Sequence, residues 1–381
     1  MPEADTLERP AATTDLRVDR DQLLTSVRAV NQTVERRNTI PILSNVMLRC
    51  EKGFLQVVAT DLDHWSARQI DYSGADIDTT VEADRLITAI DTLRPGALDI
   101  SYLHGALTIK QGRSTRKLMT LPSTDFPLAK PAEGATEFAM DAAPLLRILE
   151  TARVSVSTEE VRYYLCGVFL EVVDGNIVAA ATDGHRVVQV THPAPAKAAG
   201  APASIIGTKA VNLICSMLDA APDGAQASVA LSKGKYQVIV GRSMISGKLV
   251  DASYPDYRRA FRFEHASTLL IQASEFDRSI RAAGSAADGK TRAVRIELSS
   301  EHCEASGTAQ DGGRSVEPLD GEYQGDPLKT GINLTYAQSI AKMFGTTPKL
   351  KLGFGADGKD LILITSDDRP GVIAGVMPMN A

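Results

Sequence analysis

The apolar positions of this chain follow two periods that alternate along the sequence. Spacings of three and four residues predict an amphipathic helix that starts near Asp19, with an apolar face formed by Leu23, Leu24, Val27, Val30 and Val34. Two apolar runs, Val168–Val173 and Ile177–Ala181, are separated by Asp174-Gly175-Asn176. This turn signal between two strand-like runs predicts a β-hairpin.

The same order of elements recurs along the chain. A second helix is predicted at Arg85–Leu93, Lys209–Leu218 and Tyr336–Phe344. Two further strands follow it, as at Ala97–Tyr102 and Ala106–Gln111. Each copy therefore reads helix, hairpin, helix, hairpin, which makes it a doubled unit and predicts an α+β fold.

The repeat is also visible in the residues themselves. The segment Gly53–Asp61 (GFLQVVATD) recurs as Gly175–Asp183 (GNIVAAATD). The same displacement places Leu23 and Leu24 on Leu145 and Leu146. Several matches in the same order indicate an internal duplication, because one match could arise by chance but a series could not.

A third, fainter copy opens near Phe276 and has Thr308 where the first two copies have Thr60 and Thr182. The sequence therefore predicts three related domains, with boundaries in Pro-, Gly- and Ala-rich stretches. The predicted parts are a flexible tail at 1–14 and domains at 15–134, 135–264 and 265–381.

Composition narrows the class of protein. Apolar residues make up 44% and charged residues 23% of the 381 residues, as in ordinary globular domains. The four cysteines are scattered without a CxxC pair, so neither a disulfide framework nor a metal site is expected. The first residues do not have the pattern of a secretory signal, and a cytoplasmic location is expected.

The charge balance bears on nucleic acid. The chain has 41 Lys and Arg against 47 Asp and Glu, a net charge of −6. Proteins that hold nucleic acid tightly usually carry a basic surplus, which releases counterions from phosphates. This chain either does not bind nucleic acid or touches it weakly through a local basic surface.

Two sequence patterns could indicate chemistry. Asp183 and His185 lie two residues apart and could form an acid–base pair of a hydrolase if a strand placed them on one face, whereas an exposed turn with a glycine hinge is the simpler interpretation. Gly353 to Gly358 spells GxGxxG, but another strand follows it where a dinucleotide site needs a helix, so a hairpin turn is predicted. No catalytic residue, cofactor or metal is predicted.

Four segments together make the chain similar to a known family. They are Val161-Arg-Tyr-Tyr-Leu165, Ala181-Thr-Asp-Gly-His-Arg186, the stretch Lys248–Arg259 with its Tyr254-Pro255, and the ending Val376-Met-Pro-Met379. In order and spacing the chain resembles the bacterial sliding clamp, the beta subunit of DNA polymerase III, from about residue 15 to its end.

The resemblance implies a DNA replication processivity factor without catalysis of its own. Its fold would be a head-to-tail homodimer of three-domain protomers that closes as a ring around duplex DNA, with helices on the inner face and antiparallel sheets outside. A ring holds DNA by topology, which agrees with the low basic charge. By resemblance, the residues near the DNA would be Arg37, Arg85, Tyr163, Tyr164 and Lys209.

The resemblance also implies a groove that binds short linear peptides of the polymerase III catalytic subunit, the clamp loader and repair polymerases. The residues carried over by position are Arg162, Leu165, Thr182, Gly184, His185, Arg186, Val187, Pro255, Arg259, Asn333, Tyr336, Val376, Met377, Pro378 and Met379. Flexible methionines and aliphatic side chains suit a surface that accepts several partners.

The chain departs from the family pattern at the predicted groove and at the predicted interface. At the groove, Asn380-Ala381 replaces the usual basic and large apolar ending, and Gly375 replaces a larger aliphatic residue. At the interface, the segment 284–289 is small and polar where the family places aliphatic residues, and Arg116-Lys117 replaces more apolar neighbours opposite. Ring closure would then depend more on backbone pairing between edge strands. An alternative hypothesis is a clamp-fold adaptor that binds peptides without encircling DNA.

Overall fold

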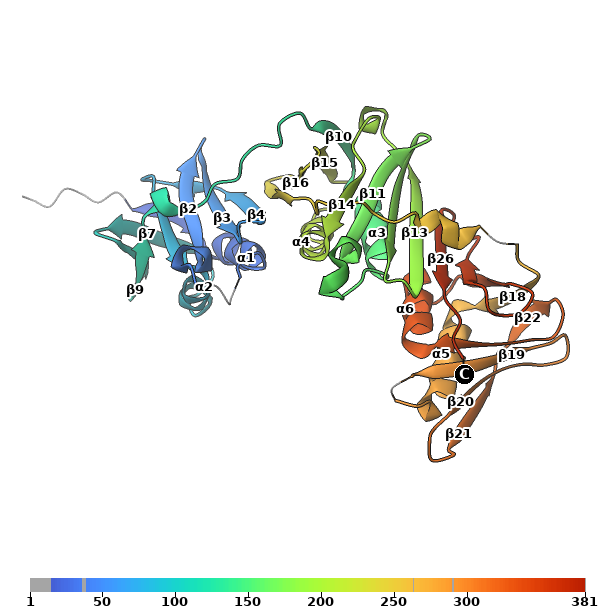
Figure 1. The fold of residues 1–381 in the computed structure, drawn as a ribbon. Coiled ribbons are helices and arrows are strands. Elements are labelled where there is room, and N and C mark those ends of the chain that lie inside the picture. The colour runs from blue at the N-terminus through green and yellow to red at the C-terminus, as the bar shows by residue number, and fades with distance from the viewer. Residues whose placement is uncertain (1–14, 36–38, 263, 290, 381) are drawn as a thin grey trace, which may run out of the picture. The chain divides into compact units, whose positions relative to one another are not determined.

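The computed structural model describes residues 15–35, 39–262, 264–289 and 291–380. Its contacts divide it into two compact units (Figure 1). The first unit holds the described residues up to Gly134 with 216–230 and 235–248, and the second holds 135–215, 231–234 and the residues from Leu249 onward. The predicted tail 1–14 and the predicted DNA neighbour Arg37 lie outside the described residues.

The first unit combines a long sheet with two helices. The helices are α1 (Arg20–Asn31) and α2 (Ala83–Asp91), with short 3-10 turns η1 (Pro41–Ser44) and η2 (Ser123–Asp125). The strands are β1 (Leu16–Asp19), β2 (Asn45–Glu51), β3 (Phe54–Thr60), β4 (His64–Ile70), β5 (Tyr72–Ser73), β6 (Asp78–Glu82), β7 (Ala97–Leu103), β8 (Ala106–Gln111), β9 (Ser114–Leu121), β15 (Gln226–Leu231), β16 (Lys235–Val240) and β17 (Ser243–Lys248).

The strands of this unit are hydrogen-bonded in the order β15-β16-β17-β4-β3-β2-β6-β9-β8-β7-β1-β5. Helices α1 and α2 lie side by side and bury their apolar faces against the strands (Figure 1). Leu23 of α1, Leu86 of α2 and Leu55 of β3 are fully buried in this core. The Asp19 carboxylate caps α1 by accepting hydrogen bonds from the backbone N–H groups of Asp21 and Gln22.

The second unit contains more elements. Its helices are α3 (Ala142–Arg153), α5 (Ala273–Ala283), α6 (Leu334–Phe344) and the larger part of α4 (Thr208–Asp219), and its 3-10 turns are η3 (Glu160–Leu165), η4 (Ala196–Ala198), η5 (Tyr257–Phe261) and η6 (Gly284–Ala286). Its strands are β10 (Thr136–Asp141), β11 (Gly167–Val173), β12 (Asn176–Thr182), β13 (Arg186–Pro193), β14 (Ser204–Gly207), β18 (Ser267–Gln272), β19 (Ala293–Leu298), β20 (Cys303–Thr308), β21 (Arg314–Pro318), β22 (Gly321–Gln324), β23 (Leu328–Asn333), β24 (Lys349–Phe354), β25 (Ile362–Thr365) and β26 (Val372–Val376).

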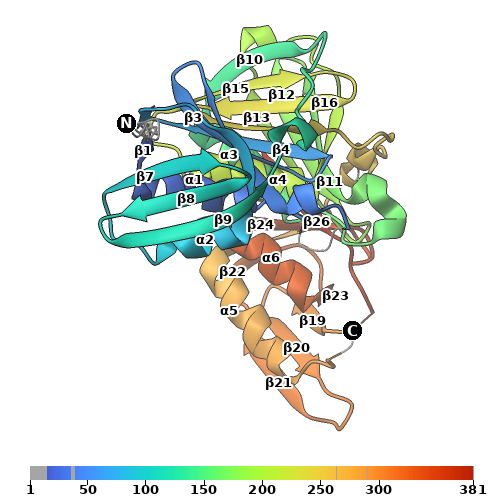
Figure 2. The same ribbon diagram turned by 90° about the vertical axis from the view of Figure 1, so that its left-hand side faces the viewer.

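Two sheets organise the second unit. One runs β14-β11-β12-β13-β26-β25-β24-β18-β22, and the other runs β21-β20-β19-β23. Helices α5 and α6 lie side by side over the second of these sheets (Figure 2). Phe276, Ile280 and Phe344 are buried between the helices and strands. The pairing of β13 with β26 brings the last strand of the chain next to the duplicated Thr-Asp motif at the end of β12.

The structure agrees with the predicted order of helices and hairpins but adds strands to it. Each predicted hairpin in the first two copies is followed by a third strand, as with β4 after β2 and β3, or β9 after β7 and β8. Strands β4 and β9 are rich in polar residues and so lack the apolar runs that mark their neighbours: alternate positions of β9 are exposed, and most positions of β4 are only partly buried. Helix α1 also ends at Asn31, before the predicted apolar position Val34.

The GxGxxG pattern forms a strand connection, as predicted. Strand β24 ends at Phe354 and pairs antiparallel with β25, so residues 353–358 lead from one strand into the next. Within the described ranges, no helix is long and apolar enough to cross a membrane, and no group of three or more His, Cys, Asp or Glu side chains is placed to hold a metal.

The buried face of α1 provides a test of the first core. We expect Leu23→Ala to lower the free energy of unfolding of this unit by about 2–5 kcal/mol, because it removes a fully buried side chain and leaves a cavity. Urea unfolding followed by the fluorescence of Trp65, the sole tryptophan, measures this unit directly. The exposed neighbour variant Gln22→Ala should change the value by less than about 0.5 kcal/mol, and an equal loss in both variants would contradict the assignment.

Candidate functional site

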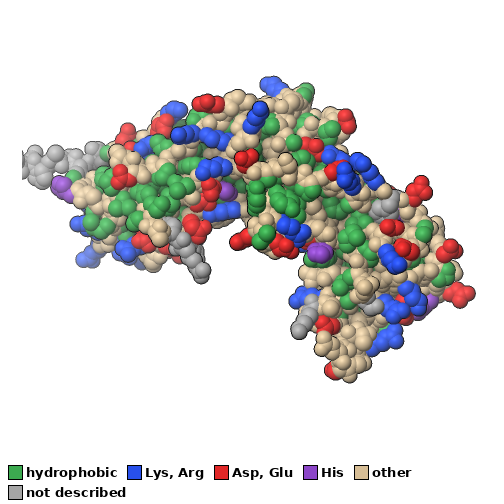
Figure 3. Space-filling model, in the orientation of Figure 1, with side chains coloured by type: hydrophobic (Ala, Val, Ile, Leu, Met, Phe, Trp, Pro, Cys, Tyr) green, Lys and Arg blue, Asp and Glu red, His purple; other side chains and the backbone are tan. Residues whose placement is uncertain are grey.

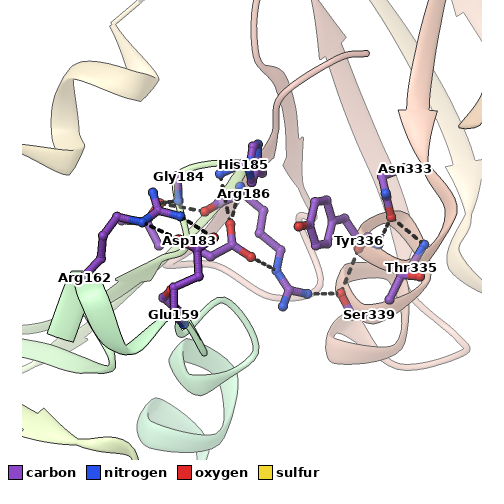
Figure 4. A network of polar contacts seen from close by, with 12 residues as sticks. Glu159, Arg162, Asp183, Gly184, His185, Arg186, Asn333, Thr335, Tyr336 and Ser339 are labelled. Carbon is purple, nitrogen blue, oxygen red and sulfur yellow. Dashed lines mark hydrogen bonds and ion pairs between the residues drawn. The ribbon is translucent and has the colours of Figure 1, made fainter. Parts of the chain in front are cut away.

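The turn between β12 and β13 is held by the carboxylate of Asp183 (Figure 4). One oxygen accepts hydrogen bonds from the backbone N–H groups of His185 (2.9 Å) and Arg186 (3.0 Å). The Thr182 hydroxyl donates to the carbonyl of Arg186 at 2.7 Å and accepts the N–H of Gly184 at 3.1 Å. The turn thus satisfies its own backbone groups, which fixes its shape.

Arg186 connects this turn to helix α6. Its Nε donates to the second oxygen of Asp183 at 2.9 Å, and both side chains of this ion pair are nearly buried. Its Nη1 donates to the hydroxyl of Ser339 at 2.6 Å, and its guanidinium lies 4.7 Å from the centre of the Tyr336 ring. A charged group that is paired, hydrogen-bonded and stacked in this way holds α6 in a defined position against the turn.

Gly184 and Arg162 form one side of the turn. Gly184 has a φ of +91°, and a side-chain Cβ at this position would lie 2.8 Å from Nη1 of Arg162. Arg162 forms a two-point ion pair with Glu159, at 2.9 and 2.8 Å. The hydrogen bond between them lowers the pKa of Glu159 and raises that of Arg162. Arg162 is therefore held beside the glycine in the charged form.

His185 and Met377 form the exposed part of the site. The imidazole ring of His185 stacks on the ring of Tyr336, with centroids 6.1 Å apart and an angle of 16° between the planes. The N–H of Met377 donates to the carbonyl of His185 at 2.7 Å, which extends the β13–β26 pairing by one residue. Burial raises the pKa of the Tyr336 hydroxyl. The site thus places an exposed methionine next to a stacked imidazole and phenol.

An apolar cluster lies beneath the turn. Its buried members are Ala180, Val187, Tyr257 and Leu361, and Phe169, Tyr254, Ala260 and Phe261 pack against them. The rings of Phe169 and Tyr254 stack at 4.9 Å and 10°. The Tyr254 hydroxyl accepts the N–H of Thr182 at 3.0 Å, and burial raises the pKa of this hydroxyl. The cluster therefore supports the turn from the apolar side while one polar contact fixes its start.

The predicted groove residues differ in how far they reach solvent. Leu165, Val187 and Val376 are buried, and so belong to the core below the surface. Arg162, Thr182, Arg186, Asn333 and Tyr336 are partly buried, while Gly184, His185, Pro255, Arg259 and Met377 are exposed. Asn333 caps helix α6, because its side chain accepts the N–H groups of Thr335 and Tyr336. Asn333 therefore positions Tyr336.

Four of the predicted residues lie at the margins of this arrangement. Pro378 and Met379 line a cavity of about 570 Å³ together with Arg295, Lys329, Asp357 and Lys359. The N–H of Met379 donates to the carbonyl of Gly331, which attaches the chain end to β23. Pro255 precedes η5, and Arg259 on η5 is exposed and pairs with Asp256 at 3.0 Å.

Several residues that build the site were not among those predicted from the sequence. Glu159 and Ser339 hold the two arginines, and Phe169, Tyr254 and Leu361 form the apolar support. The repeat carried a signal for Tyr254, because Tyr254-Pro255 matches Phe126-Pro127 of the first copy. Nothing in the sequence marked Ser339, since its contact with Arg186 is far along the chain, whereas Glu159 lies three residues before Arg162, a spacing that could have indicated their ion pair.

The structure also bears on the hypothesis of a hydrolase at Asp183 and His185. The strand β12 ends at Thr182 and β13 begins at Arg186, so the two residues lie in a turn and not on one face of a strand. Both carboxylate oxygens of Asp183 are engaged by the backbone or by Arg186. Asp183 therefore acts as the anchor of the turn.

Three of the predicted DNA neighbours lie in the second unit, on η3 and at the start of α4. Tyr163 and Tyr164 lie on η3 with ring centroids 6.0 Å apart, and Tyr163 is 56% exposed. Lys209 lies in the first turn of α4, whose Thr208 hydroxyl donates to the carbonyl of Cys166 at the end of η3. Arg85 lies in α2 of the first unit, where it is exposed and pairs with Glu82 at 2.6 Å.

The left-handed glycine of the turn provides a test of the geometry. Both Gly184→Ala and Gly175→Ala should lower the free energy of unfolding by about 1–2 kcal/mol, because both positions have positive φ. Thermal unfolding measures this. Only Gly184→Ala should shift the Nε–H NMR signal of Arg162, since an added Cβ at Gly175 meets open space. A shift in both variants, or in neither, would contradict this arrangement.

Comparisons with known proteins place the chain in a family. Three family profiles of the DNA polymerase III beta subunit match it: the N-terminal domain at 14–130, the central domain at 139–256 and the C-terminal domain at 258–380. The beta sliding clamp of Caulobacter vibrioides is 30% identical over 375 residues, covering 96% of this chain and 99% of the relative. That of Pseudomonas aeruginosa is 28% identical over 332 residues, covering 86% and 90%.

Solved structures of sliding clamps have the same fold as this chain. The sliding clamp of Bartonella birtlesii, crystallised with griselimycin, superimposes with a TM-score of 0.92 at 30% identity, covering 97% of this chain and all of that one. A Caulobacter crescentus clamp superimposes with a TM-score of 0.91 at 29% identity and the same coverage. The three related α+β domains that the repeat predicted, and the clamp fold that the resemblance implied, are confirmed. The chain belongs to the family of bacterial beta sliding clamps, the non-catalytic beta subunit of DNA polymerase III.

Proposed function

We propose that this sliding clamp works in the cytoplasm as a head-to-tail homodimer that closes as a ring around duplex DNA. Its three domains would be 15–134, 135–264 and 265–381, with the helices facing the DNA and the sheets outside. The ring tethers the replicative polymerase, and in turn the clamp loader and repair polymerases, through short peptides. The supporting evidence is membership of the clamp family together with the geometry of the β12–β13 turn.

The distribution of charge favours sliding over tight binding. Cationic and anionic side chains are mixed on the visible face of the molecule (Figure 3). Many arginines form ion pairs, such as Arg85 with Glu82 and Arg153 with Glu150. Loose contacts to phosphates carry no sequence information and allow movement along the duplex. Arg37, Arg85, Tyr163, Tyr164 and Lys209 are the proposed neighbours of the DNA.

The peptide surface is proposed at the β12–β13 turn. Arg162 and Arg186 offer positive charge, His185 and Tyr336 offer flat ring surfaces, and Met377 offers an adaptable apolar side chain that is 44% exposed. A bound peptide could place an apolar side chain against these groups and its carboxylates near the arginines. The position of Met377 next to His185 is the observation that carries this proposal.

Ring closure is proposed to use strand edges. Within the described residues, β9 pairs with β8 along most of its length but with β6 only at Thr120 and Leu121. Strand β21 lies at the edge of its sheet. The polar segment 284–289 begins with η6, which packs beside β20 and β21. An antiparallel pair between β9 of one protomer and β21 of its partner would bury these edges with little apolar area.

The ring is tested by mass and by DNA topology. We expect light scattering to give a mass near twice 40.7 kDa that persists on dilution from micromolar to nanomolar concentration. Protein loaded onto a nicked circular plasmid should remain bound at high salt and leave when the plasmid is cut once, because only topology holds it. A monomer that keeps its affinity for peptides would instead support the adaptor hypothesis.

The peptide surface is tested by Met377→Asp. We expect about tenfold weaker binding of a labelled peptide copied from the clamp-binding segment of the polymerase III catalytic subunit, because an exposed apolar contact becomes a charge that repels acidic ligands. Fluorescence anisotropy measures this. The control Val173→Asp alters a similarly exposed residue at the end of β11, opposite Asn176 at the far end of β12, and should bind as the original protein does. Equal affinity for all three proteins would exclude this surface.

A further inference from the structure

The first unit contains the same anchored turn as the proposed peptide surface. The Asp61 carboxylate accepts the N–H groups of Asp63 (3.0 Å) and His64 (2.6 Å), as Asp183 does in the second copy. The Thr60 hydroxyl donates to the carbonyl of His64 at 2.9 Å and accepts the N–H of Leu62 at 3.0 Å. The two turns therefore share each of these contacts.

The strand that flanks the turn is also equivalent. Strand β17 pairs antiparallel with β4 as β26 pairs with β13. The N–H of Lys248, the last residue of β17, donates to the carbonyl of Asp63 at 2.9 Å, just as the N–H of Met377, directly after β26, donates to the carbonyl of His185 at 2.7 Å. The first unit thus repeats the backbone of the proposed peptide surface, with different side chains.

These side chains enclose a cavity of about 350 Å³. Trp65 lies opposite Ser246 in the sheet and donates from its ring N–H to the carbonyl of Pro127 at 2.9 Å. Leu62 and Leu128 contribute apolar walls and are 38% and 53% exposed. The hydroxyl of Ser246, in a residue only 8% exposed, has no hydrogen-bond partner among the described residues. The buried hydroxyl of Tyr236, which also lines the cavity, likewise has no partner among the described residues. An apolar pocket with two unpartnered hydroxyls has the composition of a ligand site.

The rim of this cavity is cationic. Lys130, Lys235 and Lys248 line it. Lys235 donates to the carbonyls of Lys130 and Pro131, and Lys248 forms an exposed ion pair with Asp63 at 2.8 Å. Lysine side chains around an apolar pocket complement a ligand that carries an apolar group between carboxylates.

Leu62 is the residue by which this turn differs most from its counterpart between β12 and β13. It takes the place of Gly184 and has a φ of +76°, a left-handed conformation that disfavours residues with a side chain. Glycine would adopt this turn without strain. The leucine therefore adds an exposed apolar side chain to the rim at a conformational cost.

We propose that this cavity is a second docking site, for an acidic linear peptide with an aliphatic or aromatic residue between carboxylates. That the ligand is a peptide rests on the proposed function of the equivalent turn. A short extended segment fits, because the site lies beside strands and is too small for a folded partner. The acidic flanks would meet the three lysines, and the apolar side chain would pack on Trp65, Leu62 and Leu128.

Trp65 reports on this site directly, because it is the sole tryptophan of the chain. The probe is the peptide Ala-Asp-Glu-Leu-Phe-Asp-Glu-Ala, and its charge-reversed partner is Ala-Lys-Lys-Leu-Phe-Lys-Lys-Ala. We expect the acidic peptide to shift the Trp65 emission of the full chain to shorter wavelength in a saturable way, and the basic peptide to bind at least about tenfold more weakly. No saturable shift with either peptide, or equal shifts with both, would overturn the proposal.

Three variants locate the binding. Leu62→Gly should weaken binding of the acidic peptide by about tenfold, because it removes an apolar contact at the rim. The chain should stay folded, because glycine adopts the positive φ of this position without strain. Lys130→Glu should weaken binding of the acidic peptide by about threefold to tenfold, because it reverses a charge on the rim. The control is Lys52→Glu, which reverses the charge of an exposed lysine in the turn between β2 and β3 and should weaken binding by less than about twofold. Equal affinity in Leu62→Gly and the unmodified chain would overturn the proposal.

One further variant separates this site from the proposed function. Met377→Asp should leave the Trp65 response to the acidic peptide unchanged, since Met377 contacts the second copy of the turn and does not line this cavity. If Met377→Asp loses binding of the polymerase peptide but keeps the Trp65 response to the acidic peptide, both sites are supported. Loss of the Trp65 response in Met377→Asp would show that the acidic peptide binds only at the second copy. Displacement of the acidic peptide by a duplex oligonucleotide would instead assign the cavity to phosphate binding and overturn the proposal.

Discussion

The hydrogen bonds of one carboxylate, that of Asp183, determine the site. Three donors converge on it: two backbone N–H groups and the guanidinium of Arg186. Without it, the two N–H groups would need water or another partner, and the nearly buried Arg186 would lose its counter-charge. Because Arg186 also contacts Ser339 and Tyr336, this carboxylate positions helix α6 and with it the stacked pair of Tyr336 and His185.

The duplication shows that this anchor is independent of what the turn presents. In the first copy, Asp61 holds a turn that displays Leu62 next to Trp65, and in the second, Asp183 holds a turn that displays Gly184 next to His185. In the third copy Thr308 is followed by alanine, and a longer turn closes between Ala309 and Gly313. The backbone geometry thus persists in the two copies that keep aspartate, and the side chains at its tip are free to differ.

The charges of the surface follow from the requirements of a clamp. Exposed ion pairs within one helix turn, such as Arg278 with Glu275, are screened by water and so add little to stability. They do lower the local positive charge that a DNA duplex would meet. A protein that holds DNA by enclosing it gains from weak phosphate contacts, because strong ones would slow its movement.

The sequence by itself determined the internal repeat, the order of helices and hairpins and the α+β class. Period and turn chemistry act locally, so Leu23 could be assigned to the apolar face of a helix and Asp174-Gly175 to a turn from neighbouring residues alone. The polar third strands β4 and β9 could not be found in this way, because their place depends on partners far along the chain.

The candidate site, like the fold, was predicted from the sequence only in part. Resemblance indicated the residues of the β12–β13 turn, and the duplicated Thr-Asp motif indicated that the turn recurs. Only the tertiary structure showed that Val187 and Val376 are buried, that Asp183 and not His185 is the fixed point, and that Glu159, Tyr254 and Ser339 support the turn. The reason is physical: burial and hydrogen bonding depend on which distant segments pack together, and a pairing of β13 with β26 across the whole second half of the chain leaves no local signal.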